Sequence, residues 1–389
     1  MNIQDKRSDY EEYLLKMRRY FHQNPELSGK EYNSSRVIKE ELDKMGIQWR
    51  ACGLETGVLA TVQGGKPGKT ILLRGDMDAL TVQEQTGLPY ASQTEGVMHA
   101  CGHDCHMAML LTAAKILQDT REELCGTVRL AFQPAEEIAK GANSMIEQGA
   151  MDGVDACFAI HVWADVKSGS VSLASGPRMA SCDEFRVAVK GKGCHGAQPE
   201  QGVDAVVATA AIINNLQTIV SRETSPMDPA VITIGTIQAG TRFNVVAENS
   251  YMTGTTRCFS KEIWDKFPDM LNRVIHSTAE SLRAEAEVEY IRMVPPTIND
   301  DRVAAVGRAA AVKVMGEGAV ADCPPTTGAE DFSCYTQKAP GAIALLGIYN
   351  EEKGTVWPNH SGNFLVDEEQ LIKGALLYVQ VARDFNSQE

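Results

Sequence analysis

Residues 98–106, Met-His-Ala-Cys-Gly-His-Asp-Cys-His, contain three of the eight histidines and two of the ten cysteines of the chain. Cys101, His103 and His106 offer the sulfur and nitrogen donors that metal sites use, and Asp104 can orient an imidazole. The glycine between them allows the tight backbone turn that brings such side chains together. A polar loop that caps a following apolar helix, with Asp104 as the N-cap, explains part of this pattern. The density of donors predicts a metal site as well.

Length and composition describe an ordinary globular chain. With 389 residues it is too long for one core, and two or three domains are expected. The net charge of −14 is spread without long runs of like charge, which argues against nucleic acid as a partner because phosphate backbones require clustered lysine and arginine. Residues 1–10 lack the apolar core of a signal peptide, and no later stretch is apolar enough to span a membrane. A cytoplasmic protein without a membrane partner is expected.

The ten cysteines are scattered along the chain and form no Cys-x-x-Cys pair. A disulfide framework is therefore not expected. Most of the cysteines lie in apolar runs and are interpreted as small buried side chains, whereas Cys101 is set apart by its neighbours.

Helices and strands alternate in the first part of the chain. Periodic apolar residues predict three helices and two strands, at 8–21, 33–45 and 107–117 for the helices and at 58–62 and 70–74 for the strands. His22, which ends the first helix close to Pro25, is interpreted as structural rather than as a ligand.

Acidic pairs follow two of the expected strands. Asp76 and Asp78 come directly after the strand at 70–74, and the strand expected at 126–132 leads into Gln133-Pro-Ala-Glu-Glu137. Ligands of open α/β sheets bind at the carboxyl ends of the strands, so these pairs are candidates for function. A single acid there often only caps a turn, and a glutamate pair is often only solvated. Of two adjacent glutamates, however, one can bind metal while the other moves a proton.

Two further histidines lie in comparable places. His161 follows the short strand expected at 156–160, and His360 lies in a Pro-Asn-His-Ser-Gly loop that precedes the closing helix. Between these histidines, Gly328-Ala-Glu-Asp-Phe332 forms a rigid loop with two acids before another strand. Histidines at such positions can meet the acidic pairs at one edge of the sheet.

The middle of the chain has a different pattern. Four strands and two helices are expected there, at 183–190, 230–238, 250–258 and 287–293 for the strands and at 203–220 and 261–282 for the helices. Their order, βαββαβ, is that of a ferredoxin-like domain. Residues 178–294 are therefore interpreted as a domain inserted between the two parts of a first domain, 1–177 and 295–389.

Three polar residues of the inserted domain are candidates for binding. His195 lies on the glycine-rich turn 191–197, from which an imidazole can reach outward, although it can equally fill a gap in the loop. Asn244 and Arg257 could hold a carboxylate, although single polar residues near strand ends are usually only solvated.

Five residues form the predicted set of metal ligands: Cys101, His103, Glu137, His161 and His360. One zinc ion takes three or four protein ligands, so five donors predict two divalent ions about 3.5–4 Å apart. Cys101 is the predicted bridge between them. Three acids are expected to contact the ligands without binding metal themselves: Asp76, Asp78 and Asp104.

Glu136 is the predicted general base. Bound metal lowers the pKa of water, and Glu136 would take the proton of this water and pass it to a leaving nitrogen. The predicted reaction is the hydrolysis of an amide bond.

These motifs together resemble the aminoacylase, hippurate hydrolase and indole-acetyl-amino-acid hydrolase branch of the dinuclear metallopeptidases. The likeness extends over essentially the whole chain in the same order and includes Arg74-Gly-Asp-Met-Asp-Ala-Leu80, Gly191–Ala197 and Gly328–Phe332 besides the ligands. It implies an α/β, phosphorylase/hydrolase-like catalytic domain with a mixed central sheet, and a ferredoxin-like lid that also mediates dimerisation.

The resemblance also implies roles for particular residues. His195 would reach into the site of the partner subunit and stabilise the oxyanion, and Asn244 and Arg257 would face the carboxylate of the substrate. Two zinc or manganese ions per subunit, with cobalt or nickel as further options, and a homodimer or a tetramer are expected.

Two positions depart from the family pattern. The wider family has a ligand histidine where this chain has Asp76, and His103 is expected to take its place. The branch usually has Ile-Pro where this chain has Val246-Ala247, which affects the rigidity of the loop.

Three functions remain open from the sequence. The first is an amidohydrolase that acts on N-acyl amino acids, and the second is a dipeptidase or metal-dependent carboxypeptidase with the same site. The third, a metal-binding protein without activity, is disfavoured because such a site has no use for Glu136.

Overall fold

The structure, a computed structural model, describes residues 6–388. Residues 1–5 and residue 389 lie outside this range. The expectation that residues 1–10 lack a signal peptide falls partly on these residues. The described chain forms two compact units. The first comprises residues 6–176, Ile298–Pro324 and residues 331–388, and the second comprises Pro177–Thr297 and Pro325–Glu330.

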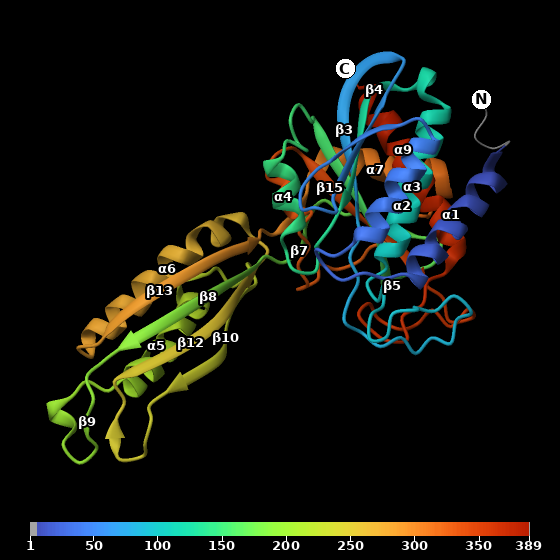
Figure 1. The fold of residues 1–389 in the computed structure, drawn as a ribbon. Coiled ribbons are helices and arrows are strands. Elements are labelled where there is room, and N and C mark those ends of the chain that lie inside the picture. The colour runs from blue at the N-terminus through green and yellow to red at the C-terminus, as the bar shows by residue number, and fades with distance from the viewer. Residues whose placement is uncertain (1–5, 389) are drawn as a thin grey trace. The chain divides into compact units, whose positions relative to one another are not determined.

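A seven-stranded mixed sheet forms the centre of the first unit (Figure 1). Its order is β1-β2-β4-β3-β5-β15-β6, in which β4, β3, β5 and β15 run parallel and the remaining strands are antiparallel to their neighbours. The strands are β1 (Gln48–Ala51), β2 (Val58–Gln63), β3 (Lys66–Asp76), β4 (Cys125–Gln133), β5 (Ala156–Lys167), β6 (Val171–Ser172) and β15 (Gly341–Tyr349).

Helices cover both faces of this sheet because successive side chains of a strand point to opposite sides. Along β3, Ile71 and Leu73 pack into a core with α1, α2, α3, α7 and α9, whereas Leu72 packs into a second core with α4 and α8. The helices are α1 (Arg7–Gln23), α2 (Tyr32–Lys44), α3 (His103–Asp119), α4 (Gly141–Glu147), α7 (Asp301–Met315), α8 (Ser333–Thr336) and α9 (Leu371–Asn386). Within residues 6–388, no helix combines the length and the apolar composition that crossing a bilayer would need.

Strands β2 and β3 are not neighbours, although only Gly64 and Gly65 separate them. β4 lies between them, antiparallel to β2 and parallel to β3. The link passes close to the start of β4, where a Cβ atom on Gly64 would lie 2.3 Å from the carbonyl oxygen of Leu124. Glycine is therefore required at this crossing.

The second unit contains the βαββαβ order that the sequence predicts. Its antiparallel sheet has the order β10-β12-β8-β13, and α5 and α6 pack with it into one hydrophobic core (Figure 1). The main elements are β8 (Cys182–Lys190), α5 (Ala205–Thr218), β10 (Ala230–Ala239), β12 (Asn249–Cys258), α6 (Lys261–Ser281) and β13 (Glu285–Val294). Two short strands, β9 (Cys194–His195) and β11 (Val245–Val246), form a separate ribbon.

The chain passes between the units within the short strands β7 (Gly176–Met179) and β14 (Thr297–Asn299). The second unit also includes Pro177 and residues 295–297, which were expected in the first domain, and one further segment differs from the expected ranges. Pro325–Glu330, expected in the first domain, belongs to the second unit. There the N–H of Ala180 donates to the carbonyls of Thr326 and Gly328, at 3.2 and 3.0 Å. Such backbone pairing between distant segments leaves no signal in the local sequence.

Candidate metal centre

Helix α3 begins at His103 rather than at residue 107 as predicted. Its N-cap is Gly102, with a left-handed φ of 90°, and Asp104 lies in the first turn instead of capping it. A Cβ atom on Gly102 would lie 2.3 Å from the side chain of Val162, so the position requires glycine. The turn at Gly102 allows Cys101 and His103 to enter the same cluster.

Cys101 is shared by two groups of donors. Its Sγ lies 3.4 Å from Nε2 of His161 and 3.3 Å from Nε2 of His360. One group that could hold an ion combines this sulfur with His103 and His161, and the other combines it with Glu137 and His360. The structure thus brings together all five residues that the sequence predicts as ligands.

His161 lies inside β5, whereas the sequence predicts that the strand ends there. The strand continues to Lys167, but its pairing with β3 stops at Arg74 and Ala159. His161 therefore lies beyond the region paired with β3, although it still pairs with Leu345 of β15, and its side chain reaches the cluster. Nδ1 of His161 donates to the carbonyl of Val162 at 2.7 Å, which leaves the lone pair of Nε2 directed at the other donors.

Burial shifts the pKa of four of these donors. It lowers the pKa of His161 and of His360, so that both rings are neutral and can act as ligands. It raises the pKa of Glu137 to about 7 and that of the Cys101 thiol well above its usual range. A bound cation would counter the last two shifts because it favours the carboxylate and the thiolate.

Several buried atoms of the cluster match a metal shell. Among residues 6–388, Nε2 of His103 and Oε1 of Glu137 have no hydrogen-bond partner. Nε2 of His103 lies 3.9 Å from Oε1 of Glu137. Buried polar atoms are nearly always hydrogen-bonded, so this set requires another explanation. Sulfur, nitrogen and oxygen donors in this arrangement fit divalent metal ions.

Asp76 and Asp78 lie behind His103, with Asp78 Oδ1 3.3 Å from Nδ1 and Asp76 Oδ2 3.6 Å from Nε2. Asp76 Oδ1 also lies 2.5 Å from Nδ1 of His106. Nε2 of His106 accepts the N–H of Val162 at 2.9 Å. Both ring nitrogens of His106 therefore have protein partners, one of them the backbone of β5.

Asp104 does not have its predicted role. Its Oδ2 lies 2.8 Å from Nδ1 of His22 and 3.1 Å from Nε of Arg18. Among the contacts within residues 6–388, it bonds to none of the five candidate ligands. The expectation that Asp104 supports a ligand is wrong because the first turn of α3 directs this side chain toward α1. His22 also contacts Glu84 at 3.2 Å and is structural, as the sequence indicates.

Two buried carboxylates hold the backbone that carries the glutamate pair. Asp78 accepts the N–H groups of Glu136 and Glu137, at 3.1 and 3.0 Å. Glu31 accepts the N–H of Ala135 at 2.9 Å, and Ala135 has a φ of 53°, which is unfavourable for alanine. Sequence reasoning missed Glu31 because an acid at the start of a helix carries no specific signal.

Asn359 ties the His360 loop to two other ligand segments. Its Nδ2 donates to the carbonyls of Cys101 and Val162, at 3.2 and 3.3 Å, and its Oδ1 accepts the N–H of Ala164 at 3.2 Å. His360 itself adopts a φ of 69°. Asn359 was also missed, although its place directly before a candidate ligand could have drawn attention to it.

His195 and Asn244 lie together in the second unit. β9 pairs with β11, and the N–H of Gly196 donates to the carbonyl of Asn244 at 2.9 Å. Both side chains are exposed. Nδ1 of His195 accepts the N–H of Ala197 at 3.1 Å, so the neutral ring carries its proton on Nε2.

Arg257 lies near the other end of β12 from this ribbon. β12 starts at Asn249, shortly after Asn244, and ends at Cys258, so roughly 25 Å separates Asn249 from Arg257 at the rise of a strand. The guanidinium of Arg257 donates to the carbonyl of Thr327 at 3.2 Å. The structure therefore does not bring Asn244 and Arg257 to one small molecule within a single copy.

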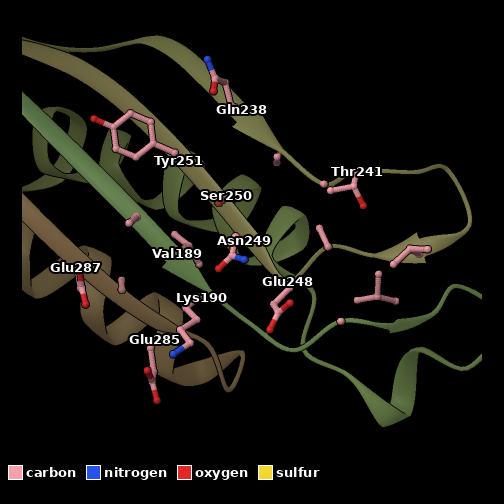
Figure 2. Close-up of a pocket in the computed structure, with 18 residues that line it drawn as sticks. Val189, Lys190, Gln238, Thr241, Glu248, Asn249, Ser250, Tyr251, Glu285 and Glu287 are labelled. Carbon is pink, nitrogen blue, oxygen red and sulfur yellow. The ribbon is translucent and has the colours of Figure 1, made fainter.

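A pocket of about 740 Å³ in the second unit is lined by none of the candidate residues (Figure 2). Charged side chains at its edge include Lys190, Glu248, Glu285 and Glu287. The candidate metal donors, with their unpartnered buried atoms and shifted pKa values, lie around Cys101 and not at this pocket. The chemistry of the side chains, and not the size of a cavity, therefore identifies the candidate site.

A buried set of thiol, imidazole and carboxylate groups at the strand ends of an α/β sheet, with a second acid beside it, defines a metal-dependent hydrolase. The family model described as peptidase family M20/M25/M40 matches residues 72–384. The chain belongs to this family. It is a metal-dependent amidohydrolase that binds divalent metals and acts on small-molecule amides.

Similar proteins span nearly the whole chain. Thermostable carboxypeptidase 1 of Saccharolobus solfataricus is 41% identical over 97% of this chain and 97% of its own length. The N-acetyl-L-cysteine deacetylase of Bacillus subtilis is 39% identical over 98% of this chain and 90% of its own. A solved dinuclear metal-binding peptidase of the M20 family from Bacillus subtilis matches with a TM-score of 0.84 and 35% identity, covering 96% of this chain and 98% of that one. The resemblance and the α/β fold class predicted from the sequence are confirmed.

Proposed function

We propose that this chain hydrolyses the amide bond of N-acyl amino acids at a centre of two divalent ions. The proposed ligands are Cys101, His103, Glu137, His161 and His360. The observation that carries the proposal is that one sulfur, Cys101 Sγ, belongs to two groups of donors, which suits a ligand that bridges two ions. Thiolate and imidazole favour zinc and carboxylate suits manganese, and cobalt or nickel is also compatible.

Glu136 is the proposed general base. It follows β4 directly beside Glu137, and its Oε1 accepts the N–H of Asp331 at 3.3 Å. In the proposed reaction Glu136 takes the proton of the attacking water and later gives it to the leaving nitrogen. When bound, the ions lower the pKa of water toward about 7 and polarise the amide carbonyl.

The proposed substrate has an acyl group and a free carboxylate. The N-acetyl-L-cysteine deacetylase among the relatives supports an N-acyl amino acid. Arg257 is proposed to hold the carboxylate because a guanidinium binds carboxylates through two parallel hydrogen bonds. A carboxypeptidase or dipeptidase is the second candidate, favoured by the 41% identity to a carboxypeptidase.

Hydrolysis of a substrate panel tests both candidates. We expect acetyl, benzoyl or indole-acetyl amino acids to give a higher kcat/KM than dipeptides with a free amine. A chelator should abolish turnover, and Zn²⁺, Mn²⁺ or Co²⁺ should restore it. Turnover that a chelator does not affect would contradict the metal centre, and faster hydrolysis of the dipeptides would select the second candidate.

His195 is proposed to donate its Nε2 proton to the developing oxyanion in the site of a partner subunit. The hydrogen bond from Ala197 to Nδ1 favours the tautomer that this role needs. The length of β12, which separates the segment with Asn244 from Arg257, supports a site built from two copies, because one small substrate does not span a strand of this length. A homodimer is therefore the proposed assembly.

Mixing two inactive variants tests this arrangement. His195→Ala and Glu136→Gln proteins, exchanged in equal amounts, should recover about a quarter of the wild-type activity, since half of the dimers are mixed and each has one complete site. Each variant exchanged with itself is the control. Without any recovery, His195 would act within its own subunit.

The cytoplasm is the proposed location. Among residues 6–388 no disulfide joins the cysteines, and the proposed centre needs Cys101 as a thiolate. Thiols persist in reducing compartments.

A further inference from the structure

The Gly328–Phe332 motif contains a residue that contacts the proposed base but has no role in the reaction described so far. Asp331 is the first residue of the first unit after the Pro325–Glu330 segment and is almost completely buried. Its N–H donates to Oε1 of Glu136 at 3.3 Å. The motif thus provides a backbone donor to the carboxylate that moves the proton.

The side chain of Asp331 is held by donors from three elements. Nη2 of Arg74 on β3 donates to Oδ1 at 2.8 Å, and Nε2 of Gln133 at the end of β4 lies 2.8 and 2.9 Å from the two oxygens. The N–H of Ala142 in the first turn of α4 donates to Oδ2 at 3.1 Å. These bonds fix the residue, and with it the direction of its N–H group.

Arg74 connects this residue to the acids behind the ligands. It is buried and forms an ion pair with Asp76 as well as with Asp331. Asp76 in turn lies behind His103 and His106. The buried guanidinium of Arg74 therefore pairs both with Asp76, which lies behind His103, and with Asp331, which contacts the proposed base.

We propose that Asp331 is a positioning residue for Glu136. Its clamped side chain holds the backbone N–H against Oε1 and limits rotation of the Glu136 carboxylate, so that the carboxylate keeps the orientation in which it exchanges a proton. The proposal rests on the assignment of Glu136 as general base. Small misplacements of a reacting group can cost about 10²-fold in rate, so the effect is measurable.

Asp331→Asn tests the proposal, because the amide keeps the shape of the side chain but cannot accept hydrogen bonds on both sides. We expect kcat to fall about 10–100-fold with KM changed less than about twofold and with wild-type metal content. Asp367→Asn is the matched control: Asp367 is also buried and accepts bonds from Lys353, Gln370 and Asn350, but it does not contact Glu136. It should lower the melting temperature and leave kcat unchanged.

A double-mutant cycle separates positioning from general damage. In the Glu136→Gln background, Asp331→Asn should have no further effect on residual turnover. If Asp331→Asn does not fold, Gln133→Met removes one donor to Asp331 and should lower kcat in the same direction by a smaller factor.

The outcomes distinguish this proposal from the assignment on which it rests. Full activity of Glu136→Gln would remove the base itself. A second outcome would overturn the positioning role and leave the base in place. In that outcome Glu136→Gln is inactive, but Asp331→Asn, or Gln133→Met in its place, keeps the kcat of the Asp367→Asn control. The same holds if Asp331→Asn lowers residual turnover equally in both backgrounds.

Discussion

Glu136→Gln protein should retain its metal and lose about 10²–10⁴-fold in kcat, the range that a positioned general base contributes. Glutamine has nearly the same shape as glutamate but cannot take up the proton of water. Elemental analysis of the purified variant measures the metal, and steady-state kinetics on the best substrate of the panel measures turnover.

Glu26→Gln is the control for this experiment. Glu26 is also a half-buried glutamate of the first unit, and it accepts the N–H groups of Asn33 and Ser34, at 2.8 Å each, at the start of α2. Its replacement should leave kcat unchanged. Loss of metal from Glu136→Gln would show that Glu136 is a ligand, and retained turnover would remove it as the base.

Cys101→Ala should have the second large effect, on the metal itself. The sulfur belongs to both donor groups, so its removal should weaken binding of both ions. Removing a residue that only supports a ligand already costs about 10–100-fold in affinity, and loss of a shared ligand should cost more. Equilibrium dialysis with elemental analysis measures the affinity, and hydrolysis should be lost in parallel.

Cys105→Ala is the matched control, because Cys105 is an equally buried cysteine four positions away on α3 and belongs to no donor group in residues 6–388. It should keep both ions and full activity. Wild-type stoichiometry and affinity in Cys101→Ala would show that the ions lie elsewhere, whatever the effect on turnover.

The regular elements could be predicted because their side-chain periods are local. Alternation along β8 and the helical spacing of α6 gave the βαββαβ order of the second unit without knowledge of contacts. Two features depended on distant segments instead. β4 inserts between β2 and β3, and Pro325–Glu330 pairs with the segment around Ala180. No short-range pattern specifies either pairing.

The residues of the candidate site also divide into those that the sequence could predict and those that it could not. Cys101 and the Glu136–Glu137 pair could be found because few structural roles require those side chains at those positions. Glu31 could not, since an acid at a helix start is common, and the only signal for Asn359 was its place before His360. The contacts of both residues exist only in the folded chain. The prediction that Asp104 supports a ligand failed for a related reason. Asp104 lies between candidate ligands in the sequence, but its neighbours in space are Arg18 and His22.

The separation of Cys101 and His360 by 259 positions has a consequence for how the protein is made. A nascent chain that still lacks the segment with His360 cannot offer the complete donor set, and closing so long a loop is unfavourable until the central sheet has formed. The complete set of ligands would then be available only after His360 has been synthesised. Metal that binds before that stage would meet only part of the donor set.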